Sequence, residues 1–338
     1  MPEDAPHWID ALRGLHLQML AALRTSVTPA AERATVTVVR GGDAIYQIDA
    51  DVEAVLIAAC EEWAREGPLV LVAEGISESG ERVFPDGAQA EEAAFRLIVD
   101  PIDGTRGLMY DKRNAWVLSA VAPNWGPATR LRDTVCAVMT ELPTSRARYA
   151  DQLWALRGGG AEGVTLDLVP EPPVGVRPAA IAPSAATDLR HGYASLVKFF
   201  PGGKELTARL EEALFAELLG TPEDGTPLLF DDQYASSGGQ LHELLCGRDR
   251  FIADLRPLIL PRACAGESVG RLCAHPYDLC TALIAEEAGV AVTDADGNPL
   301  DAPLSVHDNV AWIGYANPTL QAQIEPVLQR LLREYGLR

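Results

Sequence analysis

Hydrophobic residues recur at helical spacing in two segments near the start of the chain. The first covers residues 5–26, and the second covers 51–65, where one side carries Val52, Val55, Leu56, Ala59 and Trp63. A β-branched run at 34–39, followed by Gly-Gly-Asp, separates the two segments. The pattern therefore predicts helix, strand, helix.

Two short, continuous apolar runs come next, and each ends in an acidic residue. Residues 68–73 precede Glu74 and residues 95–99 precede Asp100. Runs of this length without polar alternation are typical of buried strands. An antiparallel meander is then predicted at 116–122, 134–139 and 149–156. The first half of the chain is thus expected to be α+β.

A proline-rich connector, LVPEPPVGVRP at 168–178, marks a change of pattern. Beyond it, helices such as 204–219 alternate with predicted strands at 179–182, 251–255 and 310–314. We therefore expect a domain boundary near residue 174, with an α+β domain at 1–173 and an α/β domain at 174–338.

Composition and charge narrow the function. A chain of 338 residues with 48% hydrophobic and 22% charged residues is typical of a globular protein with a sizeable core. The net charge of −20 disfavours a nucleic acid polymer or an anionic membrane as partner. The N-terminus lacks the order of a signal peptide, and no apolar run approaches the roughly 20 residues that span a bilayer, so a cytoplasmic protein is expected. The six cysteines contain no CxxC pair and are interpreted as reduced core residues.

Two short motifs have a structural and a functional interpretation. GGGAEG at 158–163 matches a dinucleotide fingerprint, but a strand pattern follows it where a helix is required, so a hairpin turn is predicted. GESVG at 266–270 matches a serine hydrolase elbow around Ser268, with possible partners at Asp294, His275 and His307. Proline and arginine shortly before it disfavour the buried strand that such an elbow needs, which leaves an ordinary loop as the preferred interpretation.

The stretch RLIVDPIDGTRGLMY at 96–110 combines a buried strand with two acids. Asp100 and Asp103 lie close together around Pro101, and clustered carboxylates need a cation or strongly raised pKa values. Hard oxygen ligands of this kind suit Mg²⁺, and the carbonyl of Ile102 is a further candidate ligand. Gly104 and Thr105 begin a predicted helix, whose free amides favour a phosphate. The alternative is an Asx-type turn with solvated acids.

IVDPIDGT resembles the metal motif of the inositol monophosphatase superfamily, which includes fructose-1,6-bisphosphatases and 3'(2'),5'-bisphosphate nucleotidases. Further segments resemble the family in its order, over about residues 40 to 320: DAIYQID at 43–49, VAEG at 72–75, the hairpin at 139–163 and HPYDLCTALIAEEAGVAVTDADGNPL at 275–300. The resemblance implies a layered α-β-α-β-α sandwich of the sugar-phosphatase type. It also implies a hydrolase that uses two or three Mg²⁺ ions on a small phosphorylated metabolite, and a homodimer.

Carried over residue by residue, the resemblance implies three overlapping sets of site residues. The metal ligands would be Glu74, Asp100, the Ile102 carbonyl, Asp103 and Asp278. The catalytic residues would be Asp49, Glu74 and Thr105, with Thr105 hydrogen-bonded to Asp49. The substrate would contact Asp103, Gly104, Thr105 and Arg106, where Arg106 either meets a second phosphate or lies on the solvated surface.

The sequence also departs from the family pattern. Gly75 stands where the family has a second glutamate, Tyr46 replaces a threonine, and Tyr277 replaces the tryptophan before the last aspartate. The spacing after Asp278 is about one residue shorter than usual. A degenerate member that binds phosphate or metal without turnover is therefore a second hypothesis.

Overall fold

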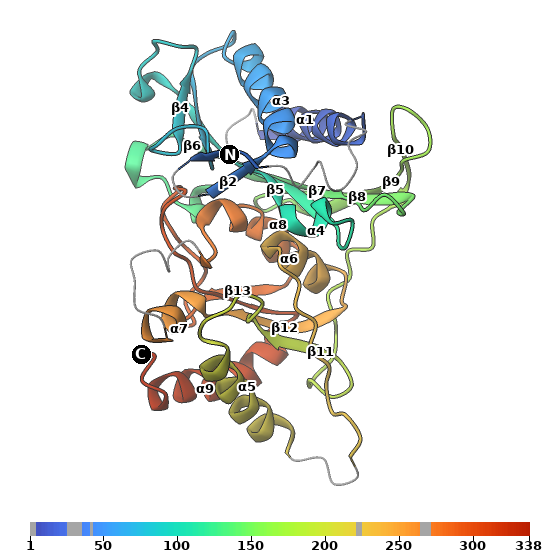
Figure 1. The fold of residues 1–338 in the computed structure, drawn as a ribbon, viewed down its shortest axis with the longest axis vertical. Helices are drawn as coiled ribbons and strands as arrows, with labels where there is room; N and C mark the ends of the chain where they lie inside the picture. Colours follow the sequence, from blue (N-terminus) through green and yellow to red (C-terminus); the bar gives the residue numbers. More distant parts are fainter. Residues whose placement is uncertain (1–4, 26–35, 41–42, 221–224, 264–271) are drawn as a thin grey trace. The chain divides into compact units, whose positions relative to one another are not determined.

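The structure is a computed structural model that describes residues 5–25, 36–40, 43–220, 225–263 and 272–338. Its chain forms two compact units (Figure 1). Unit 1 comprises Met1–Ala180, Pro276–Glu287 and Ala302–Asp308, and unit 2 comprises Ile181–His275, Ala288–Asp301 and Asn309–Arg338. The segment 276–287 thus belongs to unit 1, although it lies beyond the boundary expected near residue 174.

Unit 1 is built on an eight-stranded sheet of order β10-β9-β8-β7-β6-β5-β3-β4. Its strands are β3 (Leu69–Ala73), β4 (Glu81–Phe84), β5 (Phe95–Asp103), β6 (Ala115–Pro123), β7 (Cys136–Leu142), β8 (Tyr149–Leu156), β9 (Gly160–Asp167) and β10 (Val174–Pro178). The pair β3 and β5 is parallel and the other neighbours are antiparallel. The predicted meander is confirmed as β6, β7 and β8. A separate antiparallel pair is formed by β1 (Val36–Arg40) and β2 (Asp43–Tyr46).

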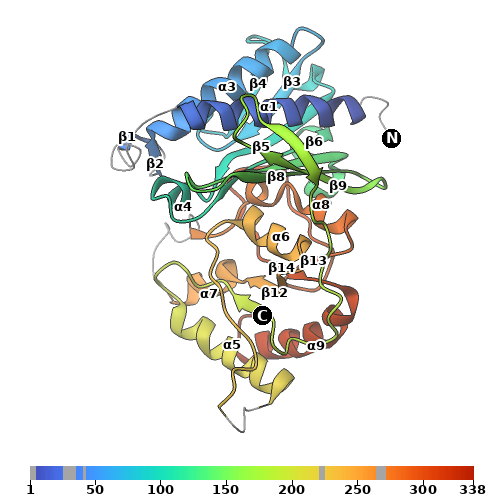
Figure 2. The ribbon, with the colours of Figure 1, turned by 90° about the vertical axis from the view of Figure 1, so that its right-hand side faces the viewer.

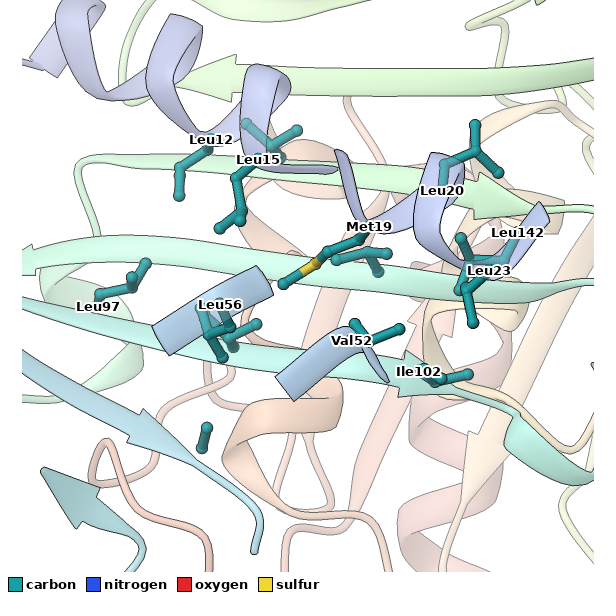
Figure 3. Close-up of a cluster of buried hydrophobic side chains, with 14 of the residues drawn as sticks. Leu12, Leu15, Met19, Leu20, Leu23, Val52, Leu56, Leu97, Ile102 and Leu142 are labelled. Carbon is teal, nitrogen blue, oxygen red and sulfur yellow. The ribbon is translucent and has the colours of Figure 1, made fainter. Parts of the chain in front are cut away.

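Two helices, α1 (Ala5–Thr25) and α3 (Gln47–Trp63), cover one face of this sheet (Figure 2). Their apolar sides pack against alternate residues of the strands, because successive side chains of a strand point to opposite faces. Figure 3 shows this cluster, which includes Leu12, Leu15, Met19, Leu20, Leu23, Val52, Leu56, Leu97, Ile102 and Leu142. Each such side chain contributes about 1.5–3 kcal/mol when it is fully buried. The predicted N-terminal helices are therefore confirmed, and α1 and α3 attach to the sheet through this core.

A buried polar network crosses the same interface. His16 of α1 is fully buried, with its ring nitrogens 2.9 Å from Thr140 Oγ1 and 2.8 Å from Ser119 Oγ. The side-chain amide of Gln152 donates to Thr140 Oγ1 at 3.1 Å. Hydrogen bonds thus join α1 to β6, β7 and β8 inside an otherwise apolar layer.

The segment 276–287 lies on the opposite face of the sheet, as Figure 2 shows for its helix α8. Its first part, the 3₁₀ helix η5 (Pro276–Leu279), packs on β5 and β6, and α8 (Ala282–Glu287) packs on β7, β8 and β9. The carboxylate of Glu287 accepts the amide hydrogens of Gly158 at 2.7 Å and Gly160 at 2.9 Å. These glycines form the turn between β8 and β9, which confirms the hairpin predicted for GGGAEG. A charge-assisted contact therefore anchors the far end of the segment that carries Asp278.

Unit 2 contains a four-stranded sheet of order β11-β12-β14-β13. The strands are β11 (Tyr193–Leu196), β12 (Asp249–Asp254), β13 (Ala291–Asp294) and β14 (Trp312–Tyr315), with β11 and β12 parallel and the other pairs antiparallel. The helices are α5 (Lys204–Leu219), α6 (Ser237–Leu245), α7 (Arg256–Ala263) and α9 (Pro318–Glu334). The expected alternation of strands and helices is present.

The strand predicted at 179–182 is wrong. These residues are irregular, and they are flanked by Pro178 and Pro183. Proline lacks the amide hydrogen that a strand ladder needs. The motif GESVG with Ser268 lies outside the described residues.

The described cysteines are free thiols, and four of them are buried: Cys60, Cys136, Cys273 and Cys280. This agrees with the interpretation as reduced core residues. No helix within the described ranges is long and apolar enough to cross a membrane.

Candidate metal centre

Two acidic residues follow paired positions on the neighbouring strands β3 and β5 of the unit 1 sheet. In the parallel pair β3 and β5, Ala73 is the partner of Val99. The next residues are Glu74, which follows β3, and Asp100, which lies inside β5, so the parallel pairing brings these acids close together. The sequence had placed each acid at a strand end, and the parallel register makes them neighbours.

A β-bulge turns Asp100 and Asp103 to the same face. Residues three apart in a regular strand point to opposite faces. Here Asp100 pairs with Leu118 and Asp103 with Trp116, so β5 has one residue more than β6 between these pairs. The strand thus continues past Val99, where the sequence predicted its end, and both carboxylates lie on the face opposite α1 and α3.

The chain then turns sharply into the short helix α4 (Thr105–Met109). Gly104 has a φ of 91°, a left-handed conformation that side chains with a Cβ rarely adopt. The Thr105 hydroxyl donates a hydrogen bond of 2.7 Å to the carbonyl of Ile102. This contact fixes the carbonyl that was expected to be a metal ligand. Arg106 is exposed on α4, and the side chain of Asp49, the expected partner of Thr105, lies outside the described part of the chain.

Three carboxylates meet at this point. Oxygen atoms of Asp100, Asp103 and Asp278 lie within 4.8 Å of one another. Asp100 and Asp103 are only 6% and 7% exposed, and Asp278 is half-buried on η5. The structure therefore brings Asp278 to the two acids of the sequence motif, in spite of its altered spacing.

The electrostatics of this cluster favour a cation. Burial raises the pKa of Asp100 well above its ordinary value, and the neighbouring charges of Asp103, Asp278 and Glu74 raise it further. The amide of Ile102 donates to Asp100 Oδ1 at 3.0 Å, as in an Asx turn, and opposes this shift. The turn of the alternative interpretation is thus present, but its acids are buried rather than solvated. Carboxylate oxygens at this spacing fit a hard divalent cation, whose charge would offset their repulsion.

Tyr277 also belongs to this site, and its contact with Glu74 could not be predicted from the sequence. The side chain is 7% exposed, and its hydroxyl is hydrogen-bonded to the carboxylate of Glu74. Burial raises the pKa of Tyr277 well above its usual range, and the charges of Asp278, Glu74 and Asp100 raise it further. The phenol is therefore the donor in this bond. The only signal in the sequence was the replacement of the family's tryptophan by tyrosine.

No family model and no curated protein sequence matches the chain. Solved structures do match it. An inositol monophosphatase from Thermotoga maritima has a TM-score of 0.61 at 17% identity, over 98% of this chain and 100% of that one. A fructose-1,6-bisphosphatase from Leishmania major, in its holo form, has a TM-score of 0.64 at 14% identity, over 98% and 96% of the two chains.

The chain has the fold of the inositol monophosphatase superfamily. An extragenic suppressor protein, SuhB, from Bartonella henselae shares this fold as well, with a TM-score of 0.62 at 16% identity over 96% and 99% of the two chains. The expected fold class, an α/β sandwich of the sugar-phosphatase type, is confirmed.

Gly75 departs from the family pattern for a backbone reason. It has a φ of 76°, so the chain leaves β3 through a left-handed residue directly after Glu74. A glutamate there would be strained, because a Cβ disfavours this conformation. Within this version of the fold, the position after Glu74 suits a glycine.

Proposed function

We propose that this protein is a Mg²⁺-dependent phosphomonoesterase that hydrolyses a small phosphorylated metabolite, such as an inositol phosphate, a sugar phosphate or a nucleotide 3'-phosphate. The observation that carries the proposal is the cluster of the Asp100, Asp103 and Asp278 carboxylates, of which the first two are buried. The fold supports it, since proteins named as inositol monophosphatases and fructose-1,6-bisphosphatases share that fold.

The carboxylates divide into two overlapping sets in this proposal. One Mg²⁺ would be held by Glu74, Asp100 and the Ile102 carbonyl. A second would be held by Asp100, Asp103 and Asp278. The resemblance to the family implies two or three ions in all. Bound ions of this kind lower the pKa of water and neutralise phosphate charge. We also propose that the protein is a member of the inositol monophosphatase superfamily.

The remaining residues act on water and on the phosphate. Thr105 and Asp49 would orient the attacking water and accept its proton. The amides of Gly104 and Thr105, at the start of α4, would receive the phosphate next to Asp103. The exposed Arg106 on the same helix would meet a second anionic group. Such cationic and amide groups are needed locally because the chain as a whole carries a charge of −20.

Phosphate release from a panel of inositol phosphates, sugar phosphates and nucleoside bisphosphates tests the proposal. We expect release with Mg²⁺, none in excess chelator, and a loss of at least about 100-fold in Asp103→Asn. Glu162→Gln removes one negative charge from an exposed position of the same unit and is the matched control. Release that persists in chelator would overturn the metal mechanism. Loss in Ser268→Ala with full activity in Asp103→Asn would support the serine hydrolase instead.

A second candidate is a protein that binds metal or phosphate without turnover. Gly75 favours it, because the glutamate expected beside Glu74 is missing. Calorimetry separates the two, since a degenerate member would bind Mg²⁺ and inorganic phosphate but release no phosphate from any substrate. We further propose, from the sequence, that the protein forms a homodimer and is located in the cytoplasm.

A further inference from the structure

Two acids of the metal centre, Glu74 and Asp278, lie outside the strands of the sheet, and Tyr277 links them. Glu74 directly follows β3 in an exposed position, and Gly75 follows it in a left-handed conformation. Asp278 lies on η5, in a segment of unit 1 whose two ends both continue along the chain into unit 2. Neither position is fixed by a sheet in the way that Asp100 and Asp103 are fixed by β5.

Tyr277 contacts both of these positions. It precedes Asp278 directly in the chain, and its hydroxyl donates to the Glu74 carboxylate. Its ring is buried on a 3₁₀ helix that packs against β5 and β6. A buried aromatic ring has few alternative rotamers, so its hydroxyl is a rigid donor.

A rigid donor matters because a free carboxylate must lose rotamer freedom when it binds a cation. Partners that hydrogen-bond to ligating side chains orient them, and their removal commonly costs 10–100-fold in metal affinity. The usual acidic neighbour of Glu74 is replaced by Gly75. The phenol of Tyr277 gives the Glu74 carboxylate a hydrogen-bonding partner.

We propose that Tyr277 is a positioning residue, whose hydroxyl holds Glu74 in the orientation for cation binding and links it to the segment that carries Asp278. The inference rests on the proposed function, since it assumes that Glu74 is a ligand. The alternative is that Tyr277 serves only as a core aromatic, in which case its ring matters and its hydroxyl does not.

Tyr277→Phe separates these two roles, because it removes one oxygen and keeps the ring. We expect calorimetric titration with Mg²⁺, and with Mn²⁺ as a second probe, to give about tenfold weaker binding than in the wild type. The thermal unfolding of both proteins in excess chelator should be similar. Tyr149→Phe, which removes the hydroxyl of a more exposed tyrosine of unit 1, is the matched control and should bind like the wild type.

A double-mutant cycle supplies the second readout. If the hydroxyl acts through Glu74, Tyr277→Phe should cause little further loss of affinity in a Glu74→Ala background. Additive losses would overturn the inference, because they would show that the hydroxyl acts independently of that carboxylate. Unchanged affinity in Tyr277→Phe, together with lost binding in Asp103→Asn, would also overturn it but leave the proposed function in place. Absence of cation binding in the wild type would overturn both.

Discussion

Protonation of His16 should weaken unit 1, because the ring is fully buried and burial disfavours its charged form. The Thr140 hydroxyl already accepts a hydrogen from Gln152, so it can direct its own hydrogen to Nδ1 of His16. The Ser119 hydroxyl lies 3.5 Å from the carbonyl of Val138, to which it donates, and can accept the hydrogen on Nε2. A second ring proton would require the Thr140 hydroxyl to turn its own hydrogen away from Nδ1. The replacement His16→Gln keeps a neutral polar side chain that does not titrate.

The size of the effect follows from the shift in pKa. Burial lowers the pKa of His16 from 6.5 to about 3. The unfolded chain therefore takes up a proton below pH 6.5, while the folded chain does not until near pH 3. The stabilisation is complete above pH 6.5 and is lost as the pH falls from 6.5 toward 3. Between pH 6.5 and pH 5 it amounts to about 2 kcal/mol, at about 1.4 kcal/mol per pH unit.

Denaturant unfolding at pH 7 and pH 5, in excess chelator, measures this effect. Tryptophan fluorescence reports mainly on unit 1, which contains five of the six tryptophans: Trp8, Trp63, Trp116, Trp125 and Trp154. The raised pKa of Asp100 acts in the opposite direction, stabilising the fold as the pH falls, but it is common to both proteins and cancels in the comparison.

We expect the wild type to lose about 2 kcal/mol more than His16→Gln between the two pH values. His7→Gln, which changes an exposed histidine of the same helix, is the control and should behave like the wild type. Equal losses in the wild type and in His16→Gln would refute the reasoning.

Three further changes test individual contacts. Gly104→Ala forces a Cβ into a left-handed conformation, so it should cost about 1–2 kcal/mol in urea unfolding, and an unchanged midpoint would contradict this. Glu287→Gln weakens the contact with the glycine turn between β8 and β9, so it should lower the free energy of unfolding by about 1 kcal/mol. Glu286→Gln, whose partner Arg157 is 3.9 Å away, should lower it less. Equal losses would show that the Glu287 contact does not anchor the segment. Arg256→Met leaves the fully buried Asp254 without the guanidinium whose Nε lies 2.8 Å from Oδ1, so unit 2 should lose about 3–5 kcal/mol in calorimetric unfolding, and a neutral result would show that the pair is dispensable.

Much of the secondary structure could be predicted because it depends on near neighbours in the chain. The helix predicted at 204–219 is α5 with the same bounds, and the apolar run at 68–73 is β3 to within one residue. One strand prediction failed because apolar periodicity does not account for neighbouring prolines. The run 179–182 is apolar enough for a strand, but the flanking prolines Pro178 and Pro183 leave it irregular.

The site shows the same division. The acids of the motif at 100–103 were predicted to be close together, yet the bulge that turns both to one face depends on how β5 pairs with β6. The contact of Tyr277 with Glu74 joins residues about 200 positions apart, and no pattern in the sequence marks it.

The sequence by itself determined the alternation of helices and strands, the acidic motif and the glycine turns, since these depend on side-chain periodicity and backbone conformation within a few residues. Only the tertiary structure decided which acids form one cluster and which side chain orients them. The reason is that sheet register and the docking of the segment 276–287 on the sheet are set by contacts between residues far apart in the chain.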